Sequence, residues 1–244
     1  MVDLIPIKKL YSYKKLYREN GEGGRHYRVV MMGEDQRLPS VTTILSATKD
    51  RSALNAWAAR IGPEAAEKIR DDAAAVGTSM HLVIDMMFRR RMLPRPQNWL
   101  TSKGYELGYK LINTFFGQLQ EVWGSEVALY YPEKYAGTTD LVGIYRGKPA
   151  IIDFKQSLRP KRHEWISDYF HQLTAYAAAH NIVHGTKIEY GVVLVACQTG
   201  ETQEFSIAGQ EFRDYQNDWM DRVAQFRSMH PLQLGLALNT PSVS

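Results

Sequence analysis

Two aspartates and a lysine, Asp140, Asp153 and Lys155, have the types and the spacing that could bind a cation and carry out chemistry. Each aspartate lies in a segment rich in Val, Ile and Tyr, and the two segments are joined by Arg146-Gly147-Lys148-Pro149. This pattern predicts a short β-hairpin. If Arg146 and Gly147 form its loop, Asp140 and Asp153 are direct neighbours on adjacent strands.

Such a hairpin brings two negative charges together. Directly opposed residues have Cβ atoms about 4.5–5.5 Å apart, and like charges at that distance destabilise a sheet. A divalent cation between the carboxylates removes the conflict, and oxygen ligands of this kind suit Mg²⁺, with Mn²⁺ as a substitute. Lys155 follows Asp153 by two residues, so the alternation of a strand directs both side chains to one face. We therefore expect Asp140, Asp153 and Lys155 to form the centre of a metal site.

An Asp-x-Lys strand also has a simpler interpretation, a solvated face with an incidental ion pair. The neighbouring residues argue against it. Ile151 and Ile152 precede Asp153, and Val142 follows Asp140. An unpaired carboxylate buried in such strands would cost several kcal/mol, so these acids need a partner.

His81 is a candidate for a further metal ligand. It follows Gly77 by four residues in a predicted helix, so both lie on one face, and the missing side chain of Gly77 would let that face approach another backbone closely. Asp85, one turn further on, would then hold the second ring nitrogen. A packed histidine beside a helix-weakening glycine is the alternative. Glu126 opens a predicted strand and is expected to support the site through water.

Other polar residues are candidates for binding a phosphate backbone. Gln172 and Tyr176 lie four residues apart on a predicted helix, where they can present an amide and a phenol side by side. The basic loop 159–163 includes Lys161 and Arg162, and a second basic run covers residues 89–91. Such patterns also arise by chance on solvated surfaces.

The elements around these residues predict a mixed sheet covered by helices. Strands are expected at residues 25–31, 126–131, 138–145, 150–154, 187–197 and 202–207. Helices are expected from a cap at Ser40 to a stop at Gly62-Pro63, and at 64–91, 102–122, 165–182 and 212–226. We expect one domain over residues 1–244 with its core at about 39–222, and a basic N-terminal segment and a C-terminal tail at the periphery.

Composition fits an ordinary globular protein, with 44% hydrophobic and 23% charged residues. The formal charge of +4 is only a weak bias toward polyanionic partners. Cys197 is the single cysteine, which excludes an internal disulfide and an iron–sulfur cluster held by cysteines of this chain. No apolar run approaches a membrane span, and no signal or transit segment stands out. We expect a cytoplasmic location in a bacterial or phage-infected cell, ahead of the mitochondrial matrix, and no membrane contact.

Four segments together resemble the ordered motifs of the RecB-like nucleases of the PD-(D/E)XK superfamily. They are Gly77-Thr78-Ser79-Met80-His81, Gly137-Thr138-Thr139-Asp140, Ile152-Asp153-Phe154-Lys155-Gln156-Ser157 and Gln172-Leu173-Thr174-Ala175-Tyr176. Within that superfamily the chain is most similar to the mitochondrial genome maintenance exonuclease group, over about residues 39–222. The resemblance implies an α/β fold with a restriction-endonuclease-like core, a mixed β-sheet flanked by helices.

The resemblance also implies roles for individual residues. His81, Asp140 and Asp153 match metal ligands, and Phe154 matches a ligand through its backbone carbonyl. Lys155 matches the catalytic lysine, acting with Asp140, Asp153 and Glu126. The set expected to contact DNA is Ser157, Lys161, Arg162, Gln172 and Tyr176.

The implied activity is that of a Mg²⁺-dependent DNA exonuclease that hydrolyses phosphodiester bonds of single strands, flaps or DNA ends in replication, recombination or repair. Replication or recombination proteins are the expected partners besides DNA. The alternatives are a structure-specific endonuclease, a catalytically inactive DNA-binding module of the same fold, and a metal-dependent hydrolase of another phosphate ester.

Overall fold

The computed structural model describes residues 5–21, 23–31 and 33–230 of the chain. Its centre is a five-stranded sheet in the order β4-β5-β6-β7-β8, in which β6 and β7 are parallel and the other neighbours antiparallel. The strands are β4 (Leu119–Tyr131), β5 (Tyr135–Tyr145), β6 (Lys148–Ser157), β7 (Tyr190–Cys197) and β8 (Thr202–Ala208). The predicted mixed sheet is therefore confirmed.

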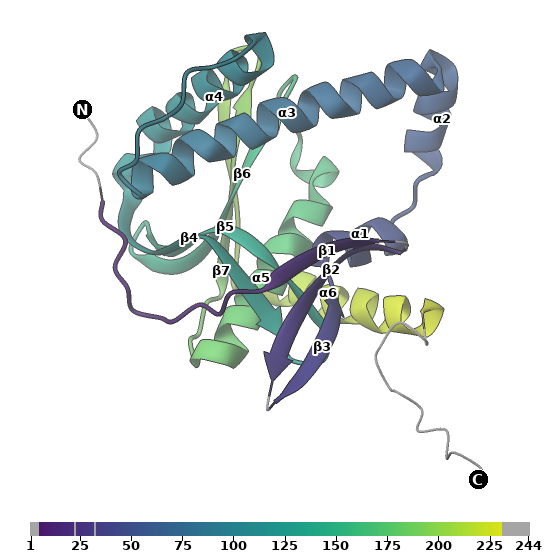
Figure 1. The fold of residues 1–244 in the computed structure, drawn as a ribbon, viewed down its shortest axis with the longest axis vertical. Helices are drawn as coiled ribbons and strands as arrows, with labels where there is room; N and C mark the ends of the chain where they lie inside the picture. The colour runs from purple at the N-terminus through teal and green to yellow at the C-terminus, as the bar shows by residue number, and fades with distance from the viewer. Residues whose placement is uncertain (1–4, 22, 32, 231–244) are drawn as a thin grey trace.

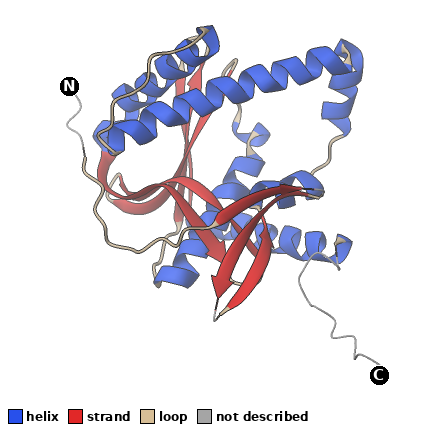
Figure 2. Ribbon diagram, viewed as in Figure 1, coloured by secondary structure: helices blue, strands red, loops and turns tan. Residues whose placement is uncertain are grey.

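The helices cover both faces of this sheet (Figures 1 and 2). They are α1 (Val41–Thr48), α2 (Ser52–Ile61), α3 (Pro63–Phe88), α4 (Trp99–Phe115), α5 (Ser167–His184) and α6 (Gly209–Met229), with short 3₁₀ turns at Phe116–Gln118 and His163–Trp165. One core lies between the sheet and the α3–α4 pair, and a second lies beneath α5 and α6. The layers match the expected sheet flanked by helices.

The hairpin of β5 and β6 has the register that the sequence predicts. Tyr145 pairs with Lys148, and the ladder continues to Leu141 and Ile152. Arg146 and Gly147 have φ angles of 48° and 75°, both in the left-handed region that the two central residues of a type I′ turn require. The paired ladder ends there, and beyond it the Phe154 N–H donates to Oδ2 of Asp140 at 2.7 Å. Direct pairing of Asp140 with Asp153 stays a prediction.

Helix α3 carries His81 to the sheet. Its first residue is Pro63, whose fixed φ suits the start of a helix. Val76, Met80 and Ile84 recur every four residues and are buried, so this stripe packs against α4 and the sheet. His81 follows Met80 and therefore lies at the border of the packed stripe.

Two helix boundaries differ from the sequence prediction. The helix expected at 102–122 ends at Phe115, and β4 begins at Leu119, because residues 119–122 pair with the end of β5. The helix expected between Ser40 and Gly62 is two helices, interrupted at residues 49–51. Ser40 does cap the first of them, since its Oγ accepts a hydrogen bond from the Thr43 N–H at 2.9 Å. At the start of β4, strand pairing overrode a continuous helical pattern.

A second, smaller sheet precedes α1. It consists of β1 (Tyr17–Gly21), β2 (Gly24–Met31) and β3 (Glu34–Pro39), all antiparallel, and only β2 was expected. The small sheet joins the main one where Ser40 forms a parallel bridge with Ala136 at the start of β5. The C-terminal tail expected at 232–244 lies outside the described residues.

Candidate active site

A cavity of about 580 Å³ opens where α3, the small sheet, the middle of the main sheet and α5 meet. Its polar lining comes from chain segments far apart in the sequence. It includes Arg18, Arg25, Tyr27, His81, Asp85, Glu126, Asp140, Lys155, Gln172 and Tyr176. Most of the residues that the sequence singles out for chemistry therefore share one cavity.

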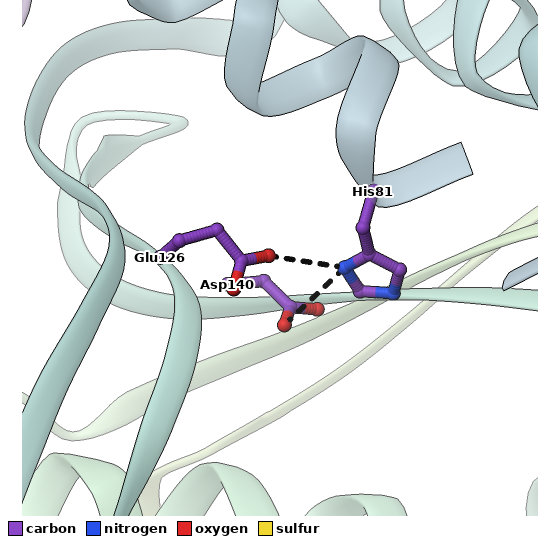
Figure 3. A group of neighbouring side chains, drawn as sticks. All are labelled: His81, Glu126 and Asp140. Carbon is purple, nitrogen blue, oxygen red and sulfur yellow. Dashed lines mark hydrogen bonds and ion pairs between the residues drawn. The ribbon is translucent and has the colours of Figure 1, made fainter. Parts of the chain in front are cut away.

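Three potential metal ligands converge in this cavity, as Figure 3 shows. The Nδ1 atom of His81 lies 3.3 Å from Oε1 of Glu126 and 3.5 Å from Oδ1 of Asp140. One ligand atom from each residue lies within 4.8 Å of the others. The imidazole comes from α3 and the two carboxylates from neighbouring strands, so the fold, not local sequence, assembles the group.

Glu126 owes its position to the pairing of β4 with β5. Ser125 pairs with Leu141 and Val127 with Thr139, which sets Glu126 opposite Asp140. Glu126 itself has a φ of 49°, a conformation that is uncommon for a residue other than glycine. Its carboxylate contacts His81 directly, and support of the site through water stays a prediction.

The electrostatics of this group favour a positive charge at its centre. Burial by itself lowers the pKa of His81, but the charge of Asp140 and the hydrogen bond with Glu126 outweigh burial and raise that pKa to about 9. In the metal-free protein the ring therefore carries a proton at neutral pH. The two carboxylates hold that positive charge at the place where a cation ligated by the same atoms would lie.

Asp153 and Lys155 form an ion pair beside this group. Asp153 is 2% exposed, and neither of its carboxylate oxygens has a hydrogen-bond partner other than the Lys155 ammonium group among the described residues. Lys155 also lies over the ring of Tyr169, 5.1 Å from its centroid. The predicted proximity of the aspartate and the lysine on one strand face is present.

The pair has shifted proton affinities. Burial raises the pKa of Asp153 to about 6, with Asp140 adding to the rise and Lys155 opposing it. Burial also lowers the pKa of Lys155, but the carboxylates of Asp153 and Asp140 keep it above its ordinary value. Lys155 is therefore an ammonium group in the metal-free protein.

The residues present fit a divalent cation. An imidazole and two carboxylates supply three close donor atoms, and the oxygens of Asp153 are buried with Lys155 as their one cationic partner in the described part of the chain. Isolated buried carboxylates are costly, and a dication with oxygen ligands offsets that cost. The imidazole nitrogen suits Mn²⁺ at least as well as Mg²⁺. Asp153 is not in the close group of three, because its carboxylate turns to the lysine.

Phe154 contributes to the site through its main chain. Its N–H donates a hydrogen bond of 2.7 Å to Oδ2 of Asp140, which fixes that carboxylate between β5 and β6. The side chain is buried in the core under α3 and α4. A carbonyl ligand at this residue stays a prediction.

Gln172 and Tyr176 line the same cavity from α5. The Gln172 amide donates to the Tyr176 hydroxyl at 3.4 Å, so the two groups lie side by side as their spacing predicts. Tyr176 is buried, and burial raises the pKa of its phenol. Its ring packs on Gly137, where an added Cβ would lie 2.7 Å from Cε1 of Tyr176.

Three residues expected to contact DNA lie outside the cavity lining. Ser157 is buried, and its hydroxyl donates to the carbonyl of Arg159, so it closes a turn. The backbone of Lys161 pairs with the side chain of Gln203. Arg162 lies over the ring of Trp165 on the surface. Contacts of Ser157, Lys161 and Arg162 with DNA stay predictions.

Two predictions for α3, on the partner of His81 and on the role of Gly77, are wrong. Asp85 does not hold His81, because its carboxylate accepts hydrogen bonds from Arg89 and from Ser125. Gly77 is not needed for a close backbone approach, since the nearest atom to an added Cβ is a side-chain carbon of Gln156 at 3.9 Å. Spacing along a helix places residues on one face but does not specify what that face meets.

The part of the site that comes from the N-terminal segment was not predicted from the sequence. Arg18, Arg25 and Tyr27 line the cavity, although this segment was expected at the periphery. The Tyr and Val residues in 24–31 favour a strand, but they do not indicate the sheet on which it docks. The basic character of residues 1–38 was the available signal.

Comparison with known proteins points to one class, exonucleases. The chain is 28% identical over 204 residues to mitochondrial genome maintenance exonuclease 1 of Mus musculus, covering 78% of this chain and 59% of that protein. The Homo sapiens protein of the same name is 24% identical over 205 residues, with 78% and 58% covered. These matches confirm the resemblance to PD-(D/E)XK-like exonucleases that the motifs indicate.

The chain spans about three fifths of the length of these relatives. No family model matches it. A crystal structure of a candidate exonuclease from Eubacterium rectale aligns with 65% of each chain at 14% identity and a TM-score of 0.46. Within residues 5–230, as far as they are described, no helix has the length and apolar character needed to cross a bilayer.

Proposed function

We propose that this chain is a metal-dependent DNA nuclease that hydrolyses phosphodiester bonds, with its active site in the cavity that contains His81, Asp140 and Lys155. The observation that carries the proposal is the convergence of His81, Glu126 and Asp140 within 4.8 Å of one another, with a buried Asp153–Lys155 pair beside them. Similarity to exonucleases supports the same reaction.

A divalent cation, Mg²⁺ or Mn²⁺, would be held by His81, Asp140 and Glu126, with Asp153 as a further ligand. When bound, such an ion acidifies a coordinated water and neutralises charge on phosphoryl oxygens. The carbonyl of Phe154 is a further proposed ligand.

The chain's own residues orient the attacking water and the substrate and neutralise charge on the phosphate. The Lys155 ammonium group, fixed by Asp153, stabilises negative charge that develops on the phosphate and orients the attacking water. Phe154 holds Asp140 in place through its amide, which preserves the ligand geometry during turnover. Gln172 and Tyr176 offer an amide and a phenol to the neighbouring backbone.

The decisive experiment is a time course with labelled DNA in Mg²⁺, in Mn²⁺ and in chelator. Lys155→Ala should abolish cleavage while DNA binding survives. Lys148→Ala is the matched control, because this exposed lysine lies at the other end of the same strand. Unchanged turnover in Lys155→Ala would remove the lysine from the reaction, and cleavage in excess chelator would refute the metal dependence.

The proposed substrate is DNA with single-stranded regions or free ends, in replication, recombination or repair. Comparing 5′- and 3′-labelled single strands, duplexes and flaps separates an exonuclease from a structure-specific endonuclease. We propose a cytoplasmic location, in a bacterium or a phage-infected cell, which fractionation of the source cells tests. DNA binding without cleavage under every metal condition would instead favour the inactive DNA-binding module.

A further inference from the structure

Two arginines of the N-terminal sheet line the cavity of the proposed active site, and within the described part of the chain neither has a partner of opposite charge. Arg18 of β1 and Arg25 of β2 both line the cavity. Among the described residues neither forms an ion pair or a side-chain hydrogen bond, and the Nε atom of Arg25 is buried without any acceptor. A buried guanidinium N–H without an acceptor is costly, so a ligand that supplies one would be favoured.

The sheet register explains why these arginines point the same way. Arg18 pairs directly with Tyr27, and Arg25 lies two residues before Tyr27 on the same strand. Paired residues and residues two apart share one face of a sheet. Arg28, the residue after Tyr27, lies on the other face of the sheet, where it forms an ion pair with Asp35.

The backbone of Arg25 is held firmly. Its N–H donates to Thr43 Oγ1 at 2.9 Å, and its carbonyl accepts from the Thr43 hydroxyl at 2.8 Å and from the Ser40 N–H at 2.8 Å. Gly24 precedes it with a φ of 100°, and an added Cβ there would lie 2.8 Å from Cγ2 of Thr43. The start of α1 and this glycine therefore fix where the Arg25 side chain begins.

Tyr27 ties this face to the proposed metal site. Its hydroxyl lies 3.3 Å from Oγ1 of Thr138, two residues before Asp140 on β5. Tyr27 is also buried with Leu38 and Ala136, the contact between the two sheets. The arginines are thus positioned relative to Asp140 by packed residues, not by a flexible loop.

A second cavity, of about 550 Å³, continues beyond Arg25. It shares Arg25 and Thr42 with the first cavity and is also lined by Gly23, Gly24 and Arg51. Arg25 therefore stands between two hollows. A chain of repeating anionic units could occupy both, whereas a single small ester would fill only one.

We propose that Arg18 and Arg25 form a subsite for a DNA phosphate. This phosphate belongs to the substrate strand and is adjacent to the phosphate at which that strand is cleaved. Guanidinium groups match phosphate oxygens through paired N–H donors. The inference rests on the proposed nuclease function for the position of the cleaved bond. It adds that the small N-terminal sheet holds the substrate strand, and that the strand continues toward Arg51.

The test measures binding and turnover separately. Affinity for a fluorescein-labelled single-stranded oligodeoxynucleotide is read by anisotropy in chelator, and kcat and KM are measured with the same strand in Mg²⁺ or Mn²⁺. Arg25→Met should weaken binding and raise KM by about tenfold or more, with kcat within about threefold, as expected for a charged hydrogen bond to phosphate. For Arg25→Met, the slope of log binding constant against log salt concentration should decrease by about 1 in magnitude, the value for one lost phosphate contact.

Arg25→Lys and Arg28→Met are the controls. The lysine variant should recover part of the affinity because it restores the charge, and Arg28→Met should bind as the unmodified protein does. Thermal melting of each variant shows that it is folded. Unchanged binding in Arg25→Met, or an equal loss in Arg28→Met, overturns the subsite.

The two proposals fail in different ways. A protein that cleaves DNA but is indifferent to Arg25→Met keeps the nuclease function and loses the subsite. A protein that cleaves nothing, yet binds the oligodeoxynucleotide in an Arg25-dependent way, keeps the subsite and loses the nuclease function.

Discussion

Gly137→Ala should disturb both the stability and the proposed active site through a single contact. The new methyl group would lie 2.7 Å from Cε1 and 2.8 Å from the hydroxyl oxygen of Tyr176. Tyr176 is 3% exposed, so its ring has little room to yield. Gly137 begins the segment that ends at Asp140, so a displaced backbone here shifts that carboxylate as well.

The expected magnitude follows from overpacking. Inserting a methyl group into a well-packed core costs about 1–3 kcal/mol. For a chain of this length each kcal/mol lowers the Tm by about 2–4 °C, so the total fall is about 2–12 °C. Thermal unfolding followed by circular dichroism measures it. Gly117→Ala is the matched control, because nothing lies within 4 Å of an added Cβ there.

A double-mutant cycle isolates the contact with Tyr176. In a Tyr176→Ala background the methyl group has space, so Gly137→Ala should then cost less than about 0.5 kcal/mol, the usual limit for sites that do not interact. If Gly137→Ala costs the same with and without the tyrosine ring, the steric reasoning is wrong. A Tm equal to that of Gly117→Ala would refute it more directly.

Three further predictions concern pH, helix packing and metal. Burial lowers the pKa of His180 in the folded protein to about 3. In the unfolded chain this histidine has its ordinary pKa of about 6.5, so below that pH the unfolded chain binds a proton that the folded protein does not. Stability should therefore fall by about 2 kcal/mol between pH 7 and pH 5, and urea unfolding should show a smaller fall in His180→Gln. Gly77→Ala should stabilise α3 by about 0.5–1 kcal/mol, because Gly is a poor helix former and space is available. Gly104→Ala should destabilise the protein by about 1–3 kcal/mol, since the added Cβ would lie 2.5 Å from the carbonyl oxygen of Val76. Chemical denaturation of the Gly77→Ala and Gly104→Ala variants shows whether their changes in unfolding free energy have opposite signs. Mn²⁺ at a hundred times its Kd should stabilise the protein by about 2.7 kcal/mol, and a gain of the same size in Asp140→Asn would contradict the assigned ligands.

Local features of the active site were predictable because they depend on short stretches of chain. The Arg146-Gly147 turn sets the hairpin register, which runs as far as Leu141 and Ile152, the residues next to Asp140 and Asp153. Strand alternation places Lys155 with Asp153. The four-residue spacing of Gln172 and Tyr176 gives their contact on α5 in the same way.

Helix ends near the sheet were predicted less well. Residues 116–122 continue a helical pattern, yet β5 offers a strand partner there and β4 begins at Leu119. Pairing with a strand more than 20 residues away decides the conformation, and a window of local sequence does not contain that partner. The same holds for β1 and β3, whose strand character depends on pairing with β2.

The sequence by itself determined the mixed sheet, the hairpin and the pairing of acid with lysine, because periodicity and turn chemistry act between near neighbours. Only the tertiary structure decided that Glu126, 45 residues from His81, is its direct partner, and that Asp85 is not. It also decided that Arg18 and Arg25 face the site, through a small sheet joined to β5 by Tyr27 and Thr138, 111 residues apart. Contacts of that separation arise from how packed layers dock on one another, and side-chain spacing along the chain carries no record of that docking.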